Sequence, residues 1–161
     1  MAKKAPYRAL EKFVEIFEKE YEIDLSEVRK ELKKQTPEEI LIPVSIFNSK
    51  LGSLETVCKY LKENLKLNYH EIAELLNRND RTVWATCRNA SRKVKKRLVA
   101  KEGQTIPISI IANRKLSVLE AIVSHLKQFN LTYREIGVML KRDERNVWTV
   151  HNRAKKKWKK L

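Results

Sequence analysis

Two stretches of the chain carry arginine, threonine and asparagine side chains at matching positions. The residues are Arg81, Thr82, Ala85 and Arg88 in one stretch, and Arg145, Asn146, Thr149 and Asn152 in the other. Arginine can form two hydrogen bonds with guanine in the major groove of DNA, and asparagine can do the same with adenine. We therefore treat both sets as candidates for contacts with base edges.

Basic side chains flank both sets. Arg78 and Arg142 lie in predicted turns just before them, where phosphate is the better-placed partner. Further basic residues extend the helices predicted there as two basic runs: Arg92, Lys93, Lys95, Lys96 and Arg97, and Lys155, Lys156, Lys157, Lys159 and Lys160. Phosphate contacts supply affinity and register but little sequence information. The other interpretation of the lysine runs is a solvated helix face.

Trp84 and Trp148 occupy the same position in the two stretches, where a residue facing the DNA groove is expected. Each Trp could pack on the helix before it. Each could instead contact thymine methyl groups or the sugar wall of the groove. A contact between repeats or subunits is a third interpretation.

The remaining reactive residue types show no catalytic or metal-binding pattern. The three histidines lack ligand spacing, and Cys58 and Cys87 lie on apolar helix faces, which predicts buried thiols. The sequence has neither a Gly-rich phosphate loop nor a Ser-His-Asp arrangement. We expect no enzyme, no metal and no cofactor.

The matching positions belong to an internal repeat. The segment 42–46 (IPVSI) recurs at 106–110 (IPISI), and 12 of the 28 residues from Tyr69 to Lys96 are identical to their counterparts 64 positions later. Ordered matching of this kind indicates duplication. The sequence therefore predicts two copies, 42–98 and 106–161, joined by a polar linker at 99–105. The copies are either two like modules or a pseudo-twofold pair within one chain.

Apolar residues at helical spacing predict three helices in each copy. In the first copy they include residues 54–65, 69–76 and 83–94, with Asp80 as the expected N-cap of the third helix. In the second copy they include 119–126, 136–140 and 147–158. The leaders 42–46 and 106–110 are either extended or short helices. The expected fold class is all-α, with an N-terminal helical segment followed by two tandem three-helix helix-turn-helix units.

The second and third predicted helices of each copy match the helix-turn-helix template. This template needs a small residue where the helices cross, apolar residues before the turn and inside the next helix, and a tolerant turn residue. The copies supply Ala73, Leu76, Asn77 and Val83, and Gly137, Leu140, Lys141 and Val147. Lysine adopts left-handed backbone less readily than asparagine, so we expect the second turn to depart slightly from the first.

On these residues the chain resembles a known family. Segments 67–76 and 81–83, and segments 131–136 and 145–147, resemble the region-4 helix-turn-helix of sigma factors and its relatives among response regulators. The resemblance implies a recognition helix that enters the major groove with its N-terminal turns toward the bases. It does not cover residues 1–41, so it does not imply a complete sigma factor.

The charge distribution supports a polyanionic partner. The 161 residues carry a formal net charge of +15. By segment, the charge is −1 for residues 1–41, +7 for 42–103 and +9 for 104–161. An excess of this size on a small chain favours nucleic acid. Absence of a long apolar run, a signal peptide or a disulfide framework favours the cytoplasm, in association with the nucleoid.

Residues 1–41 are neutral and amphipathic. Apolar residues at Leu10, Phe13, Val14, Phe17 and Tyr21 predict a helix after Pro6, and Leu25, Val28 and Leu32 suggest a second. Thr36, Pro37 and Glu39 form a helix-start pattern. This segment either packs on the repeats or mediates homodimerisation or binding of a protein partner.

These observations lead to one main expectation and several alternatives. We expect a double-stranded DNA-binding protein with two helix-turn-helix modules, acting in transcription regulation. A nucleoid or architectural protein with weak sequence specificity is the first alternative, and a sigma-like adaptor that recruits a protein partner is the second. RNA is a weaker candidate because the deep major groove of A-form RNA excludes a helix.

Overall fold

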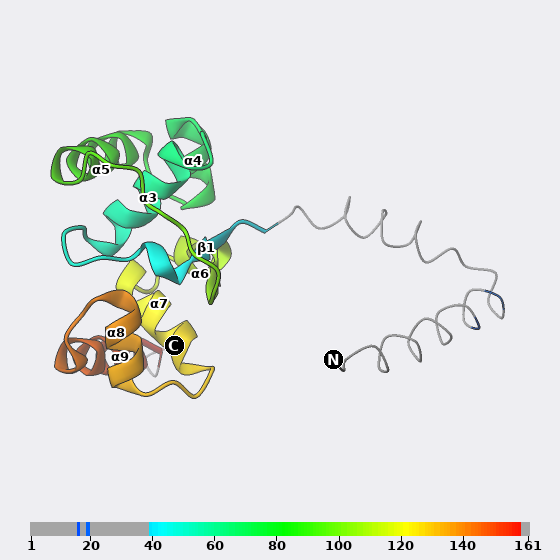
Figure 1. The fold of residues 1–161 in the computed structure, drawn as a ribbon, viewed down its shortest axis with the longest axis vertical. Helices are drawn as coiled ribbons and strands as arrows, with labels where there is room; N and C mark the ends of the chain where they lie inside the picture. The colour runs from blue at the N-terminus through cyan, green and yellow to red at the C-terminus, as the bar shows by residue number, and fades with distance from the viewer. Residues whose placement is uncertain (1–15, 17–18, 20–38, 159–161) are drawn as a thin grey trace, which may run out of the picture. The chain divides into compact units, whose positions relative to one another are not determined.

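The structure is a computed structural model that describes residues 16, 19 and 39–158. Ile16 and Lys19 are helical, and the other expectations for residues 1–38 lie outside the described residues, as do Lys159 and Lys160. The chain divides into two units, Met1–Glu39 and Ile40–Leu161. The second unit contains every element labelled in Figure 1.

The described chain is mostly helical with one small sheet, which agrees with the expected helical class apart from the sheet. The first repeat contains β1 (Leu41–Pro43), a 3-10 turn η1 (Val44–Ile46), α3 (Ser53–Glu63), α4 (Tyr69–Leu75) and α5 (Asp80–Lys93). The second contains β2 (Thr105–Pro107), α6 (Ile108–Ala112), α7 (Val118–Lys127), α8 (Tyr133–Leu140) and α9 (Glu144–Trp158). Each leader is therefore a strand followed by a short helix. Among the described residues, no helix has the length and apolar character needed to cross a membrane.

The two leaders pair with each other. β1 and β2 are antiparallel, and Ile42 lies opposite Ile106 at the centre of the register. Both side chains are fully buried. The flanking hydrogen bonds are reciprocal: Val44 N donates to Gln104 O, and Ile108 N donates to Ile40 O, both at 2.9 Å. Equivalent residues of the two repeats thus face each other across a local twofold axis.

The same reciprocity extends into the helices. η1 of the first repeat packs on α8 of the second, and α6 of the second packs on α4 of the first. α3 also contacts its counterpart α7. One hydrophobic cluster contains buried residues of both repeats, including Leu61, Ile72, Leu126 and Ile136. The two copies, 42–98 and 106–161, lie in one compact unit, and Thr105, within the predicted linker 99–105, already belongs to β2. Of the two arrangements that the sequence left open, the reciprocal strand pairing is that of a pseudo-twofold pair.

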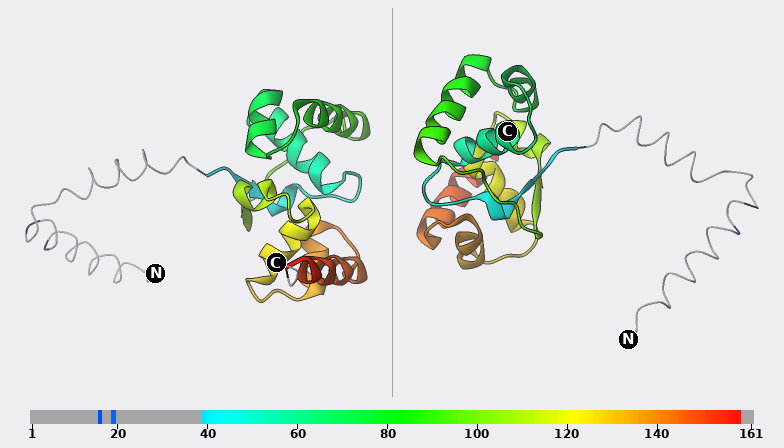
Figure 2. Two further views of the ribbon diagram at one scale, coloured as in Figure 1. Left: turned by 180° about the vertical axis from the view of Figure 1, so that it is seen from behind. Right: turned by 45° about the horizontal axis from the view of Figure 1, so that its top comes forward.

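Each repeat builds a similar helical platform. α5 packs on α3 and α4, and α9 packs on α7 and α8. In Figure 1 and in both panels of Figure 2, α5 and α9 lie on the same side of the Ile40–Leu161 unit. The strand pair lies toward the opposite side. The fold therefore presents two equivalent helices together on one side of the unit.

Candidate functional site

The turn between α4 and α5 has the same backbone geometry as the turn between α8 and α9. Asn77 has φ 49° and Lys141 has φ 54°, both in the left-handed region. Arg78 N donates to Ala73 O at 2.8 Å, and Arg142 N donates to Gly137 O at 2.8 Å. At this left-handed residue the second turn matches the first; the two turns depart only slightly, because α4 ends at Leu75 and α8 ends one equivalent position later, at Leu140. Left-handed backbone costs lysine only about 1–2 kcal/mol, which the hydrogen bonds and packing around the turn offset.

Close approach at the second turn explains the residue inside α8. A Cβ atom built on Gly137 would lie 2.7 Å from the carbonyl oxygen of Arg142, too short for a van der Waals contact. The first repeat has Ala73 at the same position, buried within α4. The small-residue requirement of the template is therefore strict in the second repeat and slightly relaxed in the first.

Capping fixes where α5 and α9 begin. The Asn79 side chain accepts a hydrogen bond from Arg81 N at 2.8 Å, and the Asp143 side chain accepts one from Arg145 N at 2.8 Å. Asn79, and not Asp80 as predicted, is the N-cap of α5. The backbone decides between these adjacent capping residues, because Asn79 is extended (φ −77°, ψ 140°) and Asp80 is already helical.

The accessible surfaces of α5 and α9 contain every base-edge candidate named from the sequence. Five of the eight side chains are exposed, namely Arg81, Thr82, Arg88, Arg145 and Asn146, and three are half-buried, namely Ala85, Thr149 and Asn152. All eight residues lie within the first three turns of their helices. Because α5 and α9 lie on one side of the unit, the two sets belong to helices on the same side, and we call the accessible surfaces of these two helices together the α5/α9 face.

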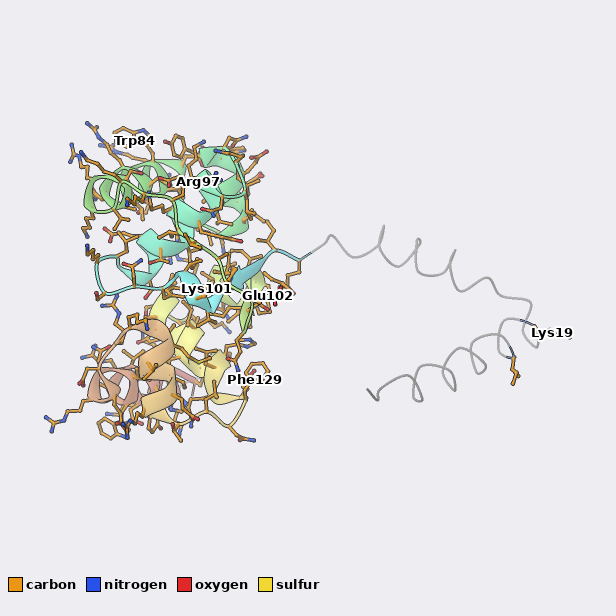
Figure 3. All side chains as sticks on the ribbon, viewed as in Figure 1. Lys19, Trp84, Arg97, Lys101, Glu102 and Phe129 are labelled. Carbon is orange, nitrogen blue, oxygen red and sulfur yellow. The ribbon has the colours of Figure 1, made fainter. Side chains whose placement is uncertain are left out.

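Trp84 and Trp148 are part of this face. Their side chains are 45% and 53% exposed, so neither is packed into the core. The Arg88 guanidinium lies over the Trp84 ring, 5.1 Å from its centroid. Figure 3 shows Trp84 at the outer edge of the unit, away from Lys101 and Glu102. Much of each ring is therefore open to contact by another molecule.

A basic hollow of about 560 Å³ lies beside Trp84. Its lining combines the aromatic rings of Tyr69 and Trp84 with Glu63 and five cationic side chains: Lys59, Lys62, Arg88, Arg92 and Lys95. The sequence did not single out Lys62 or Tyr69. In each repeat the lysine sits over the tyrosine ring, at 4.5 Å and 4.8 Å from the centroids. The recurrence of this pair as Lys127 and Tyr133 is the sequence feature that could have pointed to it.

Two lysines predicted to contact phosphate form internal ion pairs. Lys93 Nζ lies 2.7 Å from Glu55 Oε1, and Lys157 Nζ lies 2.6 Å from Glu120 Oε2. Burial acts to raise the pKa of both carboxyl groups. The lysines and the N-terminal ends of α3 and α7 outweigh it, so each net pKa lies below the ordinary value. These pairs tie the last turn of α5 and α9 to the first turn of α3 and α7.

The sequence predicted that the first basic run extends α5, and this prediction is wrong. The helix ends at Lys93, and Val94 is extended (φ −134°, ψ 105°). The following residues return to α3, where the Arg97 guanidinium donates to Glu63 O and Asn64 Nδ2 donates to Leu98 O at 2.9 Å. In the second run, Lys155 and Lys156 are exposed on α9. Arg92, Lys95 and Lys96 are exposed as well.

Arg78 and Arg142 lie at the contact between repeats and are only half-exposed. Arg142 Nη2 donates to Leu51 O of the other repeat at 2.9 Å. Burial, with a smaller contribution from nearby Arg114, lowers the pKa of Arg78. Arg114 Nη1 in turn donates to Asn77 O at 2.9 Å, a cross-repeat contact that periodicity could not reveal. Arg142 therefore has a structural task that the phosphate prediction did not include.

The two cysteines are both buried, whereas the histidines differ in exposure. Both cysteines are free and buried, which confirms the predicted thiols. His70 is exposed beside Asp80 at 3.1 Å, and His151 is buried with its Nδ1 3.0 Å from the Tyr133 hydroxyl. Within residues 39–158 and at positions 16 and 19, no group of three or more His, Cys, Asp or Glu side chains could hold a metal ion.

Comparison with known proteins adds no assignment. No family model, curated protein or solved structure matches the chain.

Proposed function

We propose that the chain binds double-stranded DNA through two helix-turn-helix modules, α4–α5 and α8–α9, and acts as a transcription regulator. In this proposal α5 and α9 are the recognition helices, which enter the major groove with their first turns toward the bases. The observation that carries it is the α5/α9 face: two helices with the same turn and cap geometry present Arg, Thr and Asn side chains on one side of one unit.

The chemistry of that face fits the partner. Arg81 and Arg145 occupy the same place in the first turn of the two helices, and both are exposed. A guanidinium there can make paired hydrogen bonds to guanine O6 and N7. Arg92, Lys95, Lys155 and Lys156 lie further along and are placed for phosphate, which would give the binding its affinity and its dependence on salt.

The direct test measures binding of a fluorescein-labelled duplex of about three helical turns by anisotropy. Because several phosphates are neutralised, we expect the affinity to fall on the order of 10³-fold between about 50 and about 200 mM salt. Arg81→Ala and Arg145→Ala should each weaken binding by about 1–3 kcal/mol and relax preference at one base pair.

Lys101→Ala is the matched control. It removes one exposed positive charge from the segment before β2, which Figure 3 places away from Trp84. We expect it to change binding much less than either arginine variant. Equal losses for all three variants, or a flat salt response, would contradict base contacts by the α5/α9 face. Losses by the arginine variants that are the same on every duplex would favour the architectural alternative.

A further inference from the structure

The order of the two modules in the sequence does not determine how they face a common ligand. Two copies placed by translation would read a duplex in the same direction, whereas copies related by a twofold axis read it in opposite directions. The strand pair distinguishes these cases. Ile42 lies opposite its own counterpart Ile106, and the bonds Val44 N to Gln104 O and Ile108 N to Ile40 O interchange under a half-turn.

The contacts between helices are related by the same twofold rotation. η1 packs on α8 as α6 packs on α4, and α3 contacts its counterpart α7. Two arginines add cross-repeat bonds at 2.9 Å: Arg142 to Leu51 O, and Arg114 to Asn77 O. The axis therefore runs from the strand pair through the α3–α7 contact. It leaves the unit between α5 and α9, on the side where Figures 1 and 2 show both helices.

B-form DNA has local twofold axes perpendicular to its length, so a twofold protein can align its axis with one of them. Each recognition helix then meets the same groove environment with opposite polarity, and the two half-sites form an inverted repeat. This is the arrangement that a symmetric dimer achieves with two chains; here it lies within one.

The symmetry is incomplete at the exposed surface. Arg81 and Trp84 have identical counterparts in Arg145 and Trp148. Three other equivalent pairs differ: Thr82 and Asn146, Ala85 and Thr149, and Arg88 and Asn152. Because an Arg-to-Asn change replaces a guanine partner with an adenine partner, the two half-sites should share part of their sequence and differ elsewhere.

We infer that the preferred ligand is one DNA duplex carrying an imperfect inverted repeat, with α5 on one half-site and α9 on the other. This rests on the DNA binding proposed above. It adds the orientation of the half-sites, their fixed spacing and the positions at which they differ.

Selection from a library of random duplexes by the full chain tests the orientation. The expected winner contains two related half-sites in opposite orientation at one spacing. A triple variant of α5, Thr82→Asn, Ala85→Thr and Arg88→Asn, gives both helices the same four candidate base-edge residues. It should convert the selected site into a perfect palindrome of the α9 half-site.

The reciprocal α9 variant, Asn146→Thr, Thr149→Ala and Asn152→Arg, serves as the matched control and should select a palindrome of the α5 half-site. Since all six positions are exposed or half-buried, circular dichroism should show unchanged melting. If a variant does melt early, selection with the natural chain already decides the orientation.

Selection of direct repeats, of single half-sites or of pairs at variable spacing would overturn the inference. The proposed DNA binding would still stand if the selected duplexes bind in a salt-dependent manner. Failure of the full chain to retain any duplex would overturn the proposed function as well. The two failures are thus distinguished by whether DNA is recovered at all.

Discussion

The two repeats share several contacts that hold each of them together, but they differ on the accessible sides of α5 and α9. In both, a lysine of α3 or α7 sits over a tyrosine ring and donates to a backbone carbonyl: Lys62 to Leu67 O, and Lys127 to Leu131 O. In both, a lysine ties the last helix to the first, at Lys93–Glu55 and Lys157–Glu120. By contrast, α5 and α9 differ at three of the four equivalent pairs of candidate base-edge residues, including Arg88 against Asn152. The comparison indicates one scaffold that presents two different surfaces.

Within α4–α5 and α8–α9, the buried differences are fewer than the exposed ones and more informative. Cys87 and His151 are equivalent and both buried, and Ala73 and Gly137 occupy the tight crossing before the turn. In the second repeat a Cβ built on Gly137 would lie 2.7 Å from the Arg142 carbonyl oxygen, whereas the first repeat holds the methyl group of Ala73 at this position. Equal backbone turns can therefore be reached with unequal internal packing.

The largest expected effect concerns the core that the repeats share. Ile106→Ala should destabilise the unit by about 2–5 kcal/mol, because a fully buried side chain at the twofold axis is truncated. Both repeats should lose stability together. Urea unfolding followed by Trp84 alone, and by Trp148 alone, checks this, with the other tryptophans changed to Phe. Two separate midpoints, with only one of them shifted, would contradict a shared core.

A smaller effect tests the crossing between α8 and α9. Gly137→Ala should lower stability by about 1–3 kcal/mol, because the added methyl meets the Arg142 carbonyl and the helices must separate. Ala73→Gly should cost about 1 kcal/mol, through backbone entropy in a helix. Shifts in the urea midpoint measure both. Stabilisation by Gly137→Ala, the usual result at an open helical site, would show that the crossing has room.

The smallest expected effect is on the pH dependence of stability. It comes from His151, whose equivalent in the first repeat is Cys87. Burial, followed by Lys155 and Lys127, lowers the pKa of this histidine, so the folded state favours its neutral form. The resulting stability is present above the ordinary pKa of about 6.5 and is lost as the pH falls through the lower folded pKa.

His151→Cys copies the residue of the first repeat and should remove this loss, a difference of up to about 1 kcal/mol between about pH 7.5 and about pH 5.5. Thermal melting at both pH values provides the measurement. His70 has a raised pKa, caused mainly by Asp80, but it is present in both proteins and cancels. Parallel pH profiles for the two proteins would mean that His151 titrates as it does in the unfolded chain.

Periodicity was sufficient for the helices and for the accessibility of residues such as Arg81 and Arg145. It failed for contacts between elements. The spacing within α5 shows which side Lys93 is on, but not that α3 presents Glu55 there. In the same way, nothing local to Arg142 indicates that Leu51, in the other repeat, offers it a carbonyl oxygen.

The remaining differences between prediction and structure arose where the sequence allowed two neighbouring caps or two backbone conformations. Asn79 and Asp80 are both good caps, and only the backbone conformation selects the first. The leaders contain Pro43 and Pro107 between β-branched residues, a pattern compatible with either a strand or a helix start. Pairing with a copy 64 residues away makes the strands, and such long-range pairing lies beyond any local signal.

The pairing of Ile42 with Ile106 also affects how the two halves behave at low protein concentration. A dimer that matches a twofold site must first assemble, and the fraction assembled falls as the protein becomes scarce. Here the two halves share one chain, so their association is intramolecular and independent of protein concentration. Titration of such a site should follow a simple one-to-one curve even at the lowest protein concentrations, with no threshold set by assembly.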